Sequence, residues 1–456
     1  MSTLSQAQQQ DVQYHLHPYT NAVRNRETGP RIITHGEGIY VYDDQGNRYV
    51  ESMAGLWSVA VGFGEPRLVE AAARQMKALP YYHTFTQKSH PSVIELSERL
   101  VNYTGGKMAQ AFFTNSGSEA NDTVVKMVWY YNNALGHRQK KKIIARLGAY
   151  HGVTVASASL TGLPGNHRDF DLPLPQILHT SNPHFYRYGK PGETEEEFAS
   201  RLAQELEDLI LREGPDTVAA FIGEPVMGAG GVIVPPRTYW QKIQAVCRKY
   251  DLLVIADEVI TGFGRLGKRF GSEVFGIEPD IQVFSKQITS SYQPLGAVLI
   301  SPKVAQVINE HSGKLGTFGH GYTASGHPVA TAVALENLKI IDERDLIGNA
   351  AEMGKLLKAE LESRLADHPL VGEIRCLGLI AAIEMVADKA TRKQFDPVGR
   401  AGGWAYERGH ENGIIVRGIG DSIAVCPPLI INAEQVTDLV ARVGKTIDDT
   451  RAHLKG

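Results

Sequence analysis

The sequence predicts an α/β fold with a large, mostly parallel sheet covered by helices on both faces. Short apolar runs alternate with stretches of helical spacing through the middle of the chain, as parallel strands and their crossover helices do. After residue 325 the alternation gives way to longer helical stretches and paired short strands. We therefore expect a large domain over residues 60–325 and a small α+β domain built from residues 1–59 and 326–456.

The composition is that of a globular chain without a charged partner. The 456 residues include 47 Lys and Arg against 50 Asp and Glu, a net charge of -3. Such a balance gives no long-range attraction to nucleic acid or to an anionic membrane. Glycine, at 46 residues, exceeds the usual share of about 7% and suggests many tight turns.

Cysteine and the chain start indicate the cellular compartment. Cys247, Cys376 and Cys426 are far apart and form no CxxC pair, so we expect buried thiols, no disulfide framework and no structural zinc. No apolar run is long enough to cross a membrane, and the polar N-terminus does not resemble a secretory signal. We expect a cytoplasmic protein.

The N-terminal elements begin with a polar stretch over residues 1–30, which we expect to form an arm or a loosely packed start. Residues 36–55 alternate apolar and polar side chains around the turn at 43–47, a pattern typical of a β-hairpin. Helical spacing follows over 66–79 and 91–103, and the second stretch stops at two glycines.

The large domain continues as alternating strands and helices. We expect strands at 109–114, 142–148, 217–225, 252–259, 280–286 and 295–301, and helices at 116–136 and 237–250. The small domain should then contain a long helical stretch (327–367), strands within 371–386, a helix, two further strands and a final helix near 432–454. Asn432 occupies a plausible N-cap position for that last helix.

Four strand ends carry chemically suggestive residues, and parallel sheets bind ligands at the carboxyl ends of their strands. The first strand leads into Thr114–Ala120, where small residues and a helix start could hold an anion such as phosphate. The same residues also fit an ordinary helix start, with Ser116 as N-cap and Glu119 completing a capping box.

The other three strand ends offer a carboxylate, an amine and an aromatic ring. Asp257 and Glu258 follow an apolar strand, where a carboxylate is partly desolvated and needs a partner. Lys286 ends another strand, where desolvation would favour its neutral, nucleophilic amine. Tyr150, followed by His151, could stack on a flat ring. Each also has a structural interpretation: a satisfied core carboxylate, a lysine reaching solvent, and core packing.

Taken together, the four strand ends suit a phosphorylated pyridine aldehyde. The anion site would anchor its phosphate, the aromatic side chain would cover the ring, and the carboxylate would keep the ring nitrogen protonated. The lysine would bind the aldehyde as a Schiff base and move a proton.

Seven stretches, in order along the chain, resemble the class III pyridoxal-phosphate aminotransferases of fold type I. They are TNSGSEAND (114–122), AYHG (149–152), EPVMGAGG (224–231), IADEVITGFGRLG (255–267), SKQITSSYQPLGAV (285–298), GHGYTASGHP (319–328) and VGEIRCLGLIAAIE (371–384). The resemblance covers nearly the whole chain. Its most specific part is the DEVxxGFGR stretch, followed by Lys286.

The resemblance implies a role for each cofactor residue and implies no metal. Lys286 would be the Schiff-base lysine and Asp257 the partner of the pyridine nitrogen, and these two are the expected catalytic residues. The remaining expected cofactor contacts are Val259 and Tyr150 on the ring faces, His151 beside them, Gly117 and Ser118 at the phosphate, Glu224 near the lysine, and Tyr322 and Thr323 at the phosphate of a neighbouring subunit. The active form would thus be a homodimer or a dimer of dimers.

The chain departs from the family pattern at two places. Gln287 stands where a glycine often follows the lysine, and the common RGxGL appears as Arg375 to Leu379 with Cys376 in place of glycine. We expect these changes to alter loop shape rather than activity.

The subgroup is inferred from the substrate side. Trp57, Tyr82 and Phe85 would form an apolar pocket suited to an amine without a carboxylate, with Tyr150 beside it. Arg417 resembles the mobile arginine of amine–pyruvate (omega) transaminases and would hold a keto-acid carboxylate. Trp57 and Phe85 could instead serve packing, and Arg417 could be a surface or domain-bridging residue.

The expected reaction is a ping-pong transfer of an amino group from a primary amine to pyruvate. The donor would be aromatic or aliphatic with (S) preference, and the products a ketone or aldehyde and L-alanine. One alternative is an ω-amino acid aminotransferase for 4-aminobutyrate, β-alanine or ornithine; another is a different pyridoxal-phosphate reaction, decarboxylating or aminomutase, on this fold. A non-catalytic scaffold is the third, against which the intact Lys286 and Asp257 argue.

Overall fold

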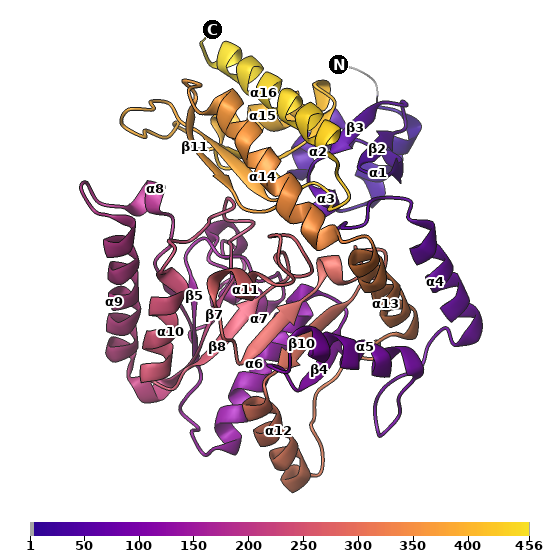
Figure 1. The fold of residues 1–456 in the computed structure, drawn as a ribbon, viewed down its shortest axis with the longest axis vertical. Helices are drawn as coiled ribbons and strands as arrows, with labels where there is room; N and C mark the ends of the chain where they lie inside the picture. The colour runs from indigo at the N-terminus through magenta and orange to yellow at the C-terminus, as the bar shows by residue number, and fades with distance from the viewer. Residues whose placement is uncertain (1–3, 456) are drawn as a thin grey trace.

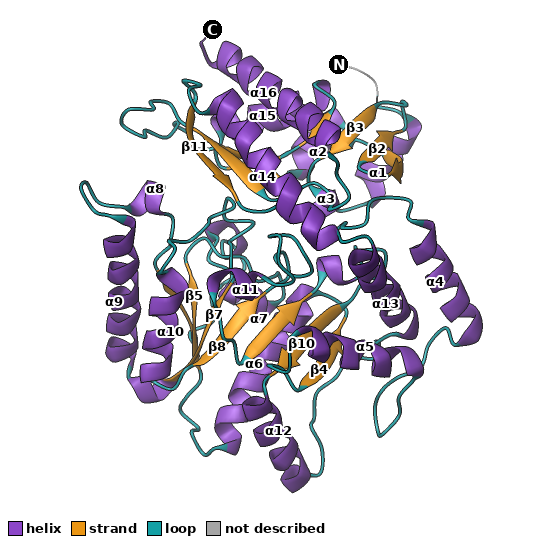
Figure 2. Cartoon of the chain, viewed as in Figure 1, coloured by secondary structure: helices purple, strands orange, loops and turns teal. Residues whose placement is uncertain are grey.

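The central sheet has seven strands, and the computed structural model describes it as part of residues 4–455 (Figures 1 and 2). The strand order is β4 (Gln110–Thr114), β10 (Gly296–Ile300), β9 (Ile281–Phe284), β8 (Leu253–Asp257), β7 (Val218–Gly223), β5 (Lys142–Arg146) and β6 (Ile177–Thr180). β10 is antiparallel to both neighbours, and the other pairs are parallel. The predicted α/β fold with a mostly parallel sheet is confirmed.

Helices cover both faces of this sheet, as Figure 2 shows. On one face lie α6 (Gly117–Ala134), α7 (Val155–Leu160) and α12 (Pro302–Leu315), which share an apolar core with the strands. On the other face lie α9 (Glu195–Glu213) and α10 (Tyr239–Lys249), whose apolar sides pack on Phe221 and Val254. Because the strands are apolar on both sides, the sheet is buried between the two layers.

Two four-stranded sheets lie beyond the carboxyl ends of the central strands. The first has the order β1 (Ile33–Glu37), β2 (Tyr40–Asp43), β3 (Arg48–Glu51) and β13 (Ile414–Ile415). The second has the order β11 (Val371–Cys376), β12 (Ala381–Met385), β15 (Ser422–Val425) and β14 (Arg417–Ile419). Since β13 pairs in parallel with β3, strands from both halves of the chain share one sheet. The division at residues 59 and 325 stays a prediction.

The long helices of the C-terminal part pack against each other and against these sheets (Figure 1). They are α14 (Leu346–Leu365), α15 (Arg400–Glu411) and α16 (Ala433–Lys455). α13 (Pro328–Glu343) instead packs on α4 (Pro66–Ala78) and α5 (Pro91–Tyr103). The short elements are α3 (Ala54–Trp57), α8 (Phe185–Tyr188), α11 (Gly271–Phe275) and the 3₁₀ turns at Pro164–Asn166, Pro215–Thr217 and Lys286–Ile288.

The structure corrects three expectations about elements and burial. The stretch 327–367 is two helices, because Asp345 adopts a left-handed conformation (φ 46°) and its carboxylate accepts from the Gly348 N–H. The N-terminal stretch contains α1 (Gln6–Tyr14) and α2 (Ala22–Thr28), although none of their residues is buried. Cys376 is only half-buried, whereas Cys247 and Cys426 are buried as expected. No helix within residues 4–455 is long and apolar enough to cross a membrane.

Candidate active site

A cavity of about 170 Å³ lies where the strands β4, β5, β7, β8 and β9 end at their carboxyl edge. Its lining contains eight of the predicted site residues: Gly117, Ser118, Tyr150, His151, Glu224, Asp257, Val259 and Lys286. Asp257 is the last residue of β8, and the other seven come from the loop, turn or helix start that follows one of these strands. The fold therefore brings together side chains that are far apart in the sequence.

Asp257, the last residue of β8, is buried and held by three donors. Its Oδ2 lies 2.7 Å from His151 Nδ1 and accepts from Asn121 Nδ2 at 2.9 Å. Its Oδ1 accepts from the Val259 N–H at 3.1 Å. The carboxylate is thus fixed in orientation and desolvated, as a group that must hold a proton on a ring nitrogen requires.

Two buried polar atoms beside Asp257 have no hydrogen-bond partner in the described chain. They are Nε2 of His151 and Oδ1 of Asn121, and both residues line the cavity. Buried polar atoms are normally paired, so these atoms point to a group that binds here. Gly117 agrees with this, because a Cβ at that position would lie 3.2 Å from the Val259 side chain and narrow the cavity. These residues fit a planar, polar cofactor.

The start of α6 forms the anion end of the cavity. Ser116 caps the helix, and its Oγ accepts from the Glu119 N–H at 3.1 Å. The reciprocal half of the expected capping box is absent, because the Glu119 carboxylate accepts from the Asn115 N–H at 2.7 Å instead. The Gly117 and Ser118 backbone N–H groups stand at the positive end of an 18-residue helix, where an anion is favoured.

Lys286 opens the 3₁₀ turn after β9 with a left-handed backbone (φ 47°). A non-glycine residue rarely holds this conformation, and where it does the surroundings usually enforce it. Burial lowers the pKa of the Lys286 amine, although the negative charges of Asp257 and Glu224 oppose that shift. The site therefore favours the neutral, nucleophilic amine.

Glu224 follows β7 and orients the Tyr150 loop. Its carboxylate accepts from the Tyr150 N–H at 3.0 Å and the Gly228 N–H at 3.1 Å. Burial raises the pKa of Glu224. Burial also raises the pKa of the Tyr150 phenol, so that hydroxyl stays protonated. Tyr150 is half-buried and therefore keeps part of its ring open to a ligand.

Arg417 starts β14, in the sheet that faces the cavity from the C-terminal part. Its positive charge lowers the pKa of the Lys286 amine and of the Tyr150 phenol, although burial is the larger influence on both groups. Among residues 4–455 it forms no ion pair. It therefore remains available to bind a carboxylate.

Trp57 and Phe85 do not line this cavity in the single chain. Trp57 is buried and belongs to the same apolar cluster as Ile260, which does line the cavity. Phe85 is 43% exposed and lies against Gly321, where an added Cβ would come within 2.7 Å of the ring. The predicted substrate contacts of both remain predictions.

Tyr322 and Thr323 also lie outside this cavity. The Tyr322 hydroxyl donates to the Glu119 carbonyl at 3.1 Å, while Thr323 is exposed and its carbonyl accepts from the Tyr81 hydroxyl at 2.8 Å. Phe85 and Thr323 thus belong to adjoining surface segments. The expected contacts of Tyr322 and Thr323 are to the phosphate of a neighbouring subunit, which a single chain does not test.

The analysis of the sequence missed four lining residues: Asn121, Gly152, Ile260 and Ser285. Asn121 lies four residues after Gly117 on α6, and this spacing puts both on one helix face. That spacing could have identified it. Ile260 carries no polar group and left no signal in the sequence.

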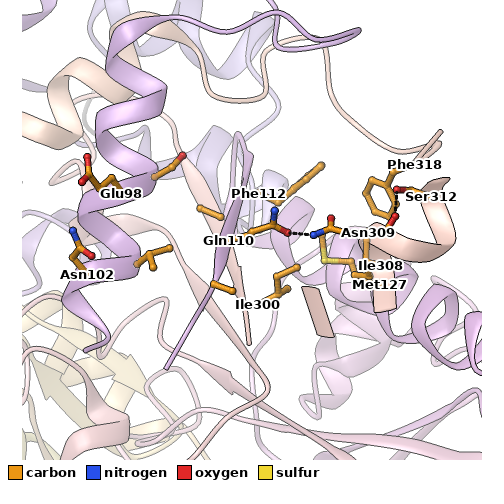
Figure 3. A pocket seen from close by; sticks show the side chains of 14 residues that line it. Glu98, Asn102, Gln110, Phe112, Met127, Ile300, Ile308, Asn309, Ser312 and Phe318 are labelled. Atoms are coloured by element: carbon orange, nitrogen blue, oxygen red, sulfur yellow. Dashed lines mark hydrogen bonds between the residues drawn. The ribbon is translucent and has the colours of Figure 1, made fainter. Parts of the chain in front are cut away.

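A second cavity, of about 500 Å³, lies between α5, β4 and α12 (Figure 3). Its lining is mostly apolar, and the Gln110 side chain accepts from Asn309 Nδ2 at 3.1 Å across it. Glu98 is the single ionisable residue in the lining. Without a base and nucleophile together, this cavity offers no chemistry comparable to that around Lys286.

Comparison with known proteins gives one consistent family. The family described as aminotransferase class-III matches residues 22–447. The crystal structure of the omega transaminase from Pseudomonas jessenii in complex with PMP is 61% identical, covers 98% of each chain and superposes with a TM-score of 0.97. A thermostable four-fold mutant of an omega transaminase from the same organism is also 61% identical, covers 98% of this chain and 99% of its own, and has a TM-score of 0.97.

Two plant relatives are named for a specific substrate, gamma aminobutyrate. The mitochondrial gamma aminobutyrate transaminase 1 of Solanum lycopersicum is 52% identical over 441 residues, which are 96% of this chain and 85% of that protein. The chloroplastic gamma aminobutyrate transaminase 3 of the same plant is 51% identical over 95% of this chain and 84% of its own length.

Proposed function

We infer the reaction from the family: the chain belongs to the class-III aminotransferases and is a pyridoxal-phosphate enzyme. We propose that it moves the amino group of a primary amine without a carboxylate, aromatic or aliphatic and of (S) configuration, to pyruvate. The products are a ketone or aldehyde and L-alanine, formed in a ping-pong cycle.

Each cavity residue has one task in this proposal. The N–H groups of Gly117 and Ser118 would hold the cofactor's phosphate, and the Asp257 carboxylate would hold the proton on its ring nitrogen. Val259 and Tyr150 would contact the ring, with His151 and Glu224 beside it. The bound cofactor supplies an electron-accepting ring that stabilises negative charge on the amine-bearing carbon.

Lys286 is the base of the reaction. Its neutral amine, favoured by burial, takes the proton from the amine-bearing carbon and returns it to a neighbouring carbon. The Asp257, Glu224 and His151 side chains around this transfer are buried. The same amine binds the cofactor covalently between reactions.

The observation that carries the proposal is Arg417, which forms no ion pair within residues 4–455 and whose positive charge lowers the pKa of Lys286. Pyruvate presents a carboxylate that two guanidinium N–H groups can bind, whereas a plain amine does not. One pocket can therefore accept both substrates in turn if Arg417 binds the acceptor and moves aside for the donor. One omega transaminase was engineered for the synthesis of bulky amines by changing a tryptophan, a phenylalanine and an arginine. This variant supports a role in substrate binding for Trp57, Phe85 and Arg417.

Replacing Arg417 tests this division of labour. In Arg417→Ala we expect the pyruvate KM to rise about 10- to 100-fold, because the variant loses a charge-assisted pair of hydrogen bonds to the pyruvate carboxylate. The KM for (S)-1-phenylethylamine should change less than about threefold, because that donor has no carboxylate. Arg74→Ala, on the exposed side of α4, is the matched arginine control. Equal effects on both substrates would remove Arg417 from the acceptor role.

The second candidate function is transfer from an ω-amino acid such as 4-aminobutyrate. The tomato relatives named for that substrate favour it. Arg417 could then bind the carboxylate of the donor as well as that of the acceptor. In that case Arg417→Ala would raise both KM values.

We also propose a homodimer, or a dimer of dimers, in the cytoplasm. Phe85 and Thr323 support the dimer, because both are exposed on adjoining segments away from the cavity of their own chain. The near-neutral charge and the three unpaired cysteines support the cytoplasm. A mass of one chain in light scattering of the active enzyme would contradict the dimer.

A further inference from the structure

Gln287, which directly follows Lys286, is fully buried and uses its whole side-chain amide. Its Nε2 donates to the carbonyls of Ile260 at 3.0 Å and Gly262 at 2.6 Å. Its Oε1 accepts from Arg265 Nη2 at 3.1 Å. A glycine at this position, common in the family, could make none of these contacts.

These contacts join the Lys286 turn to the segment 257–262. That segment begins with Asp257, which holds the ring-nitrogen proton in the proposed function, and contains Val259 and Ile260 of the cavity wall. The Gln287 amide therefore links the two strand ends that carry the two expected catalytic groups. It contacts this segment from behind the cavity, because Gln287 itself is not part of the lining.

Arg265 extends the link to the C-terminal part of the chain. Its Nη1 donates to the carbonyls of Leu379 at 3.0 Å and Pro427 at 2.5 Å. Arg265 is fully buried, and it forms no ion pair within the described chain. Gln287 is the one side chain that accepts from it. A buried guanidinium without a carboxylate depends on such acceptors, so removing the amide would affect Arg265 as well.

The Lys286 turn needs external support. Lys286 in the turn, and Ser290 and Ser291 just after it, have left-handed backbone conformations that side chains disfavour. From the other side, Asn337 Nδ2 donates to the carbonyls of Gln287 at 2.8 Å and Ile288 at 3.1 Å. Buried side-chain hydrogen bonds from Gln287 and Asn337 thus add to the backbone hydrogen bonds of the turn.

We propose that Gln287 is a positioning residue that holds the Lys286 amine in line with Asp257. It touches neither substrate nor cofactor and acts through the Lys286 turn and the segment 257–262. The inference rests on the role proposed for Lys286, and it is independent of which amine is the natural donor.

Gln287→Leu tests the proposal against a matched control, Gln244→Leu. Gln244, on α10, is also buried, and its amide donates to the carbonyls of Trp240 at 3.2 Å and Gly276 at 3.1 Å. It accepts from the Glu278 N–H at 2.7 Å. Both substitutions therefore remove two donated hydrogen bonds and one accepted hydrogen bond from a buried glutamine, but only one of them adjoins Lys286.

In Gln287→Leu we expect kcat to fall about 10- to 100-fold, while both KM values change less than about threefold. The pH at half-maximal kcat on the acid side should rise by about one unit, because a loosened Lys286 amine regains water and its pKa rises. The dissociation constant for pyridoxal phosphate, measured by adding it to the cofactor-free variant, should increase about tenfold. Gln244→Leu should lower the unfolding temperature and leave kcat, the acid-side pH at half-maximal kcat and the dissociation constant for pyridoxal phosphate unchanged.

Equal loss of stability in the two variants, with an unchanged pH profile and cofactor affinity in Gln287→Leu, would overturn the proposal. If that variant does not fold, Gln287→Glu replaces it. This variant keeps an oxygen that accepts from Arg265. An ionised carboxylate, however, repels the carbonyl oxygens of Ile260 and Gly262. The loss of kcat relative to the wild type should therefore grow as the pH rises. A deficit independent of pH would count against the proposal.

The wild-type chain supplies the reference with whichever donor it uses best. Borohydride reduction followed by mass spectrometry of the Lys286 peptide checks that the cofactor is bound there. If it is bound elsewhere, the proposed role of Lys286 fails. If it is bound there and Gln287→Leu behaves as Gln244→Leu does, only the positioning role fails.

Discussion

At the scale of single residues, the side chain of Asp257 shows how the site is built from groups that differ in origin. Its donors are a histidine from the loop after β5, an asparagine from α6 and a backbone N–H of its own loop. Two of these donors have a second polar atom without a partner, and both line the same cavity. A carboxylate fixed in this way is prepared for a polar ligand before the ligand arrives.

Lys286→Ala tests the residue on which the chemistry depends. We expect kcat to fall at least about 10⁴-fold, because the variant loses both the base and the group that binds the cofactor. The variant, incubated with pyridoxal phosphate and an amine, should stop before any ketone is released. Single-turnover mixing followed by chromatography measures the ketone. Full activity in a variant that still contains cofactor would refute the assignment.

The structure brings eight of the predicted residues together around one cavity, while their roles stay predictions. Asp257 and Lys286 are conspicuous in the sequence because a charged side chain directly after an apolar strand is costly to bury unless it is paired, and such groups are frequent at functional sites. Asn121 was missed because an asparagine within a helix has many ordinary roles. The predicted capping box paired the Glu119 carboxylate with the Ser116 N–H, whereas the carboxylate accepts from the Asn115 N–H. The sequence does not distinguish these two neighbouring N–H groups at the helix start.

At the scale of elements, helix and strand positions followed closely from apolar spacing. The predicted helix at 91–103 matches α5, and the predicted strand at 252–259 contains β8. β6 and α9 were not predicted, and the break at Asp345 was missed because the apolar spacing continues across it. Which strands pair could not be predicted either, because the pairing of β13 with β3 joins residues more than 360 positions apart.

Asn432→Ala tests the predicted start of the last helix. The Asn432 Oδ1 accepts from the Gln435 N–H at 2.9 Å, and the Gln435 side chain accepts from the Asn432 N–H at 3.1 Å. We expect the loss of this cap to lower the free energy of unfolding by about 1 kcal/mol, measured by urea denaturation of the cofactor-loaded protein. Asn432→Ser keeps a capping oxygen and should restore most of it. An unchanged midpoint in Asn432→Ala would show that α16 is held by packing alone.

At the scale of the whole molecule, the site belongs to the assembled chain and not to one segment. The central sheet positions the residues proposed to bind the cofactor, while Arg417 comes from a strand of the C-terminal part and Trp57 from the N-terminal part. Length and alternation of elements predicted the central sheet. They could not predict how close Arg417 lies to Lys286, because that distance depends on how separate sheets pack.

The same scale decides the choice of donor. A pocket with apolar side chains and one guanidinium can accept an amine and a keto acid in turn, or it can bind a carboxylate at both steps. The charges around the cavity are compatible with both uses. In the proposed dimer, Trp57 and the second subunit would limit which donors reach Lys286, so the intact, cofactor-loaded enzyme is the form to test.

The most direct test is the reaction of the cofactor-loaded enzyme with (S)-1-phenylethylamine and pyruvate, followed by the absorbance of acetophenone. We predict strong formation that requires both substrates, with a kcat/KM for this donor at least about tenfold above that for 4-aminobutyrate under the same conditions. The (R) enantiomer is the control for specific binding. No acetophenone from an enzyme that turns over 4-aminobutyrate would contradict the amine–pyruvate assignment and establish an ω-amino acid aminotransferase.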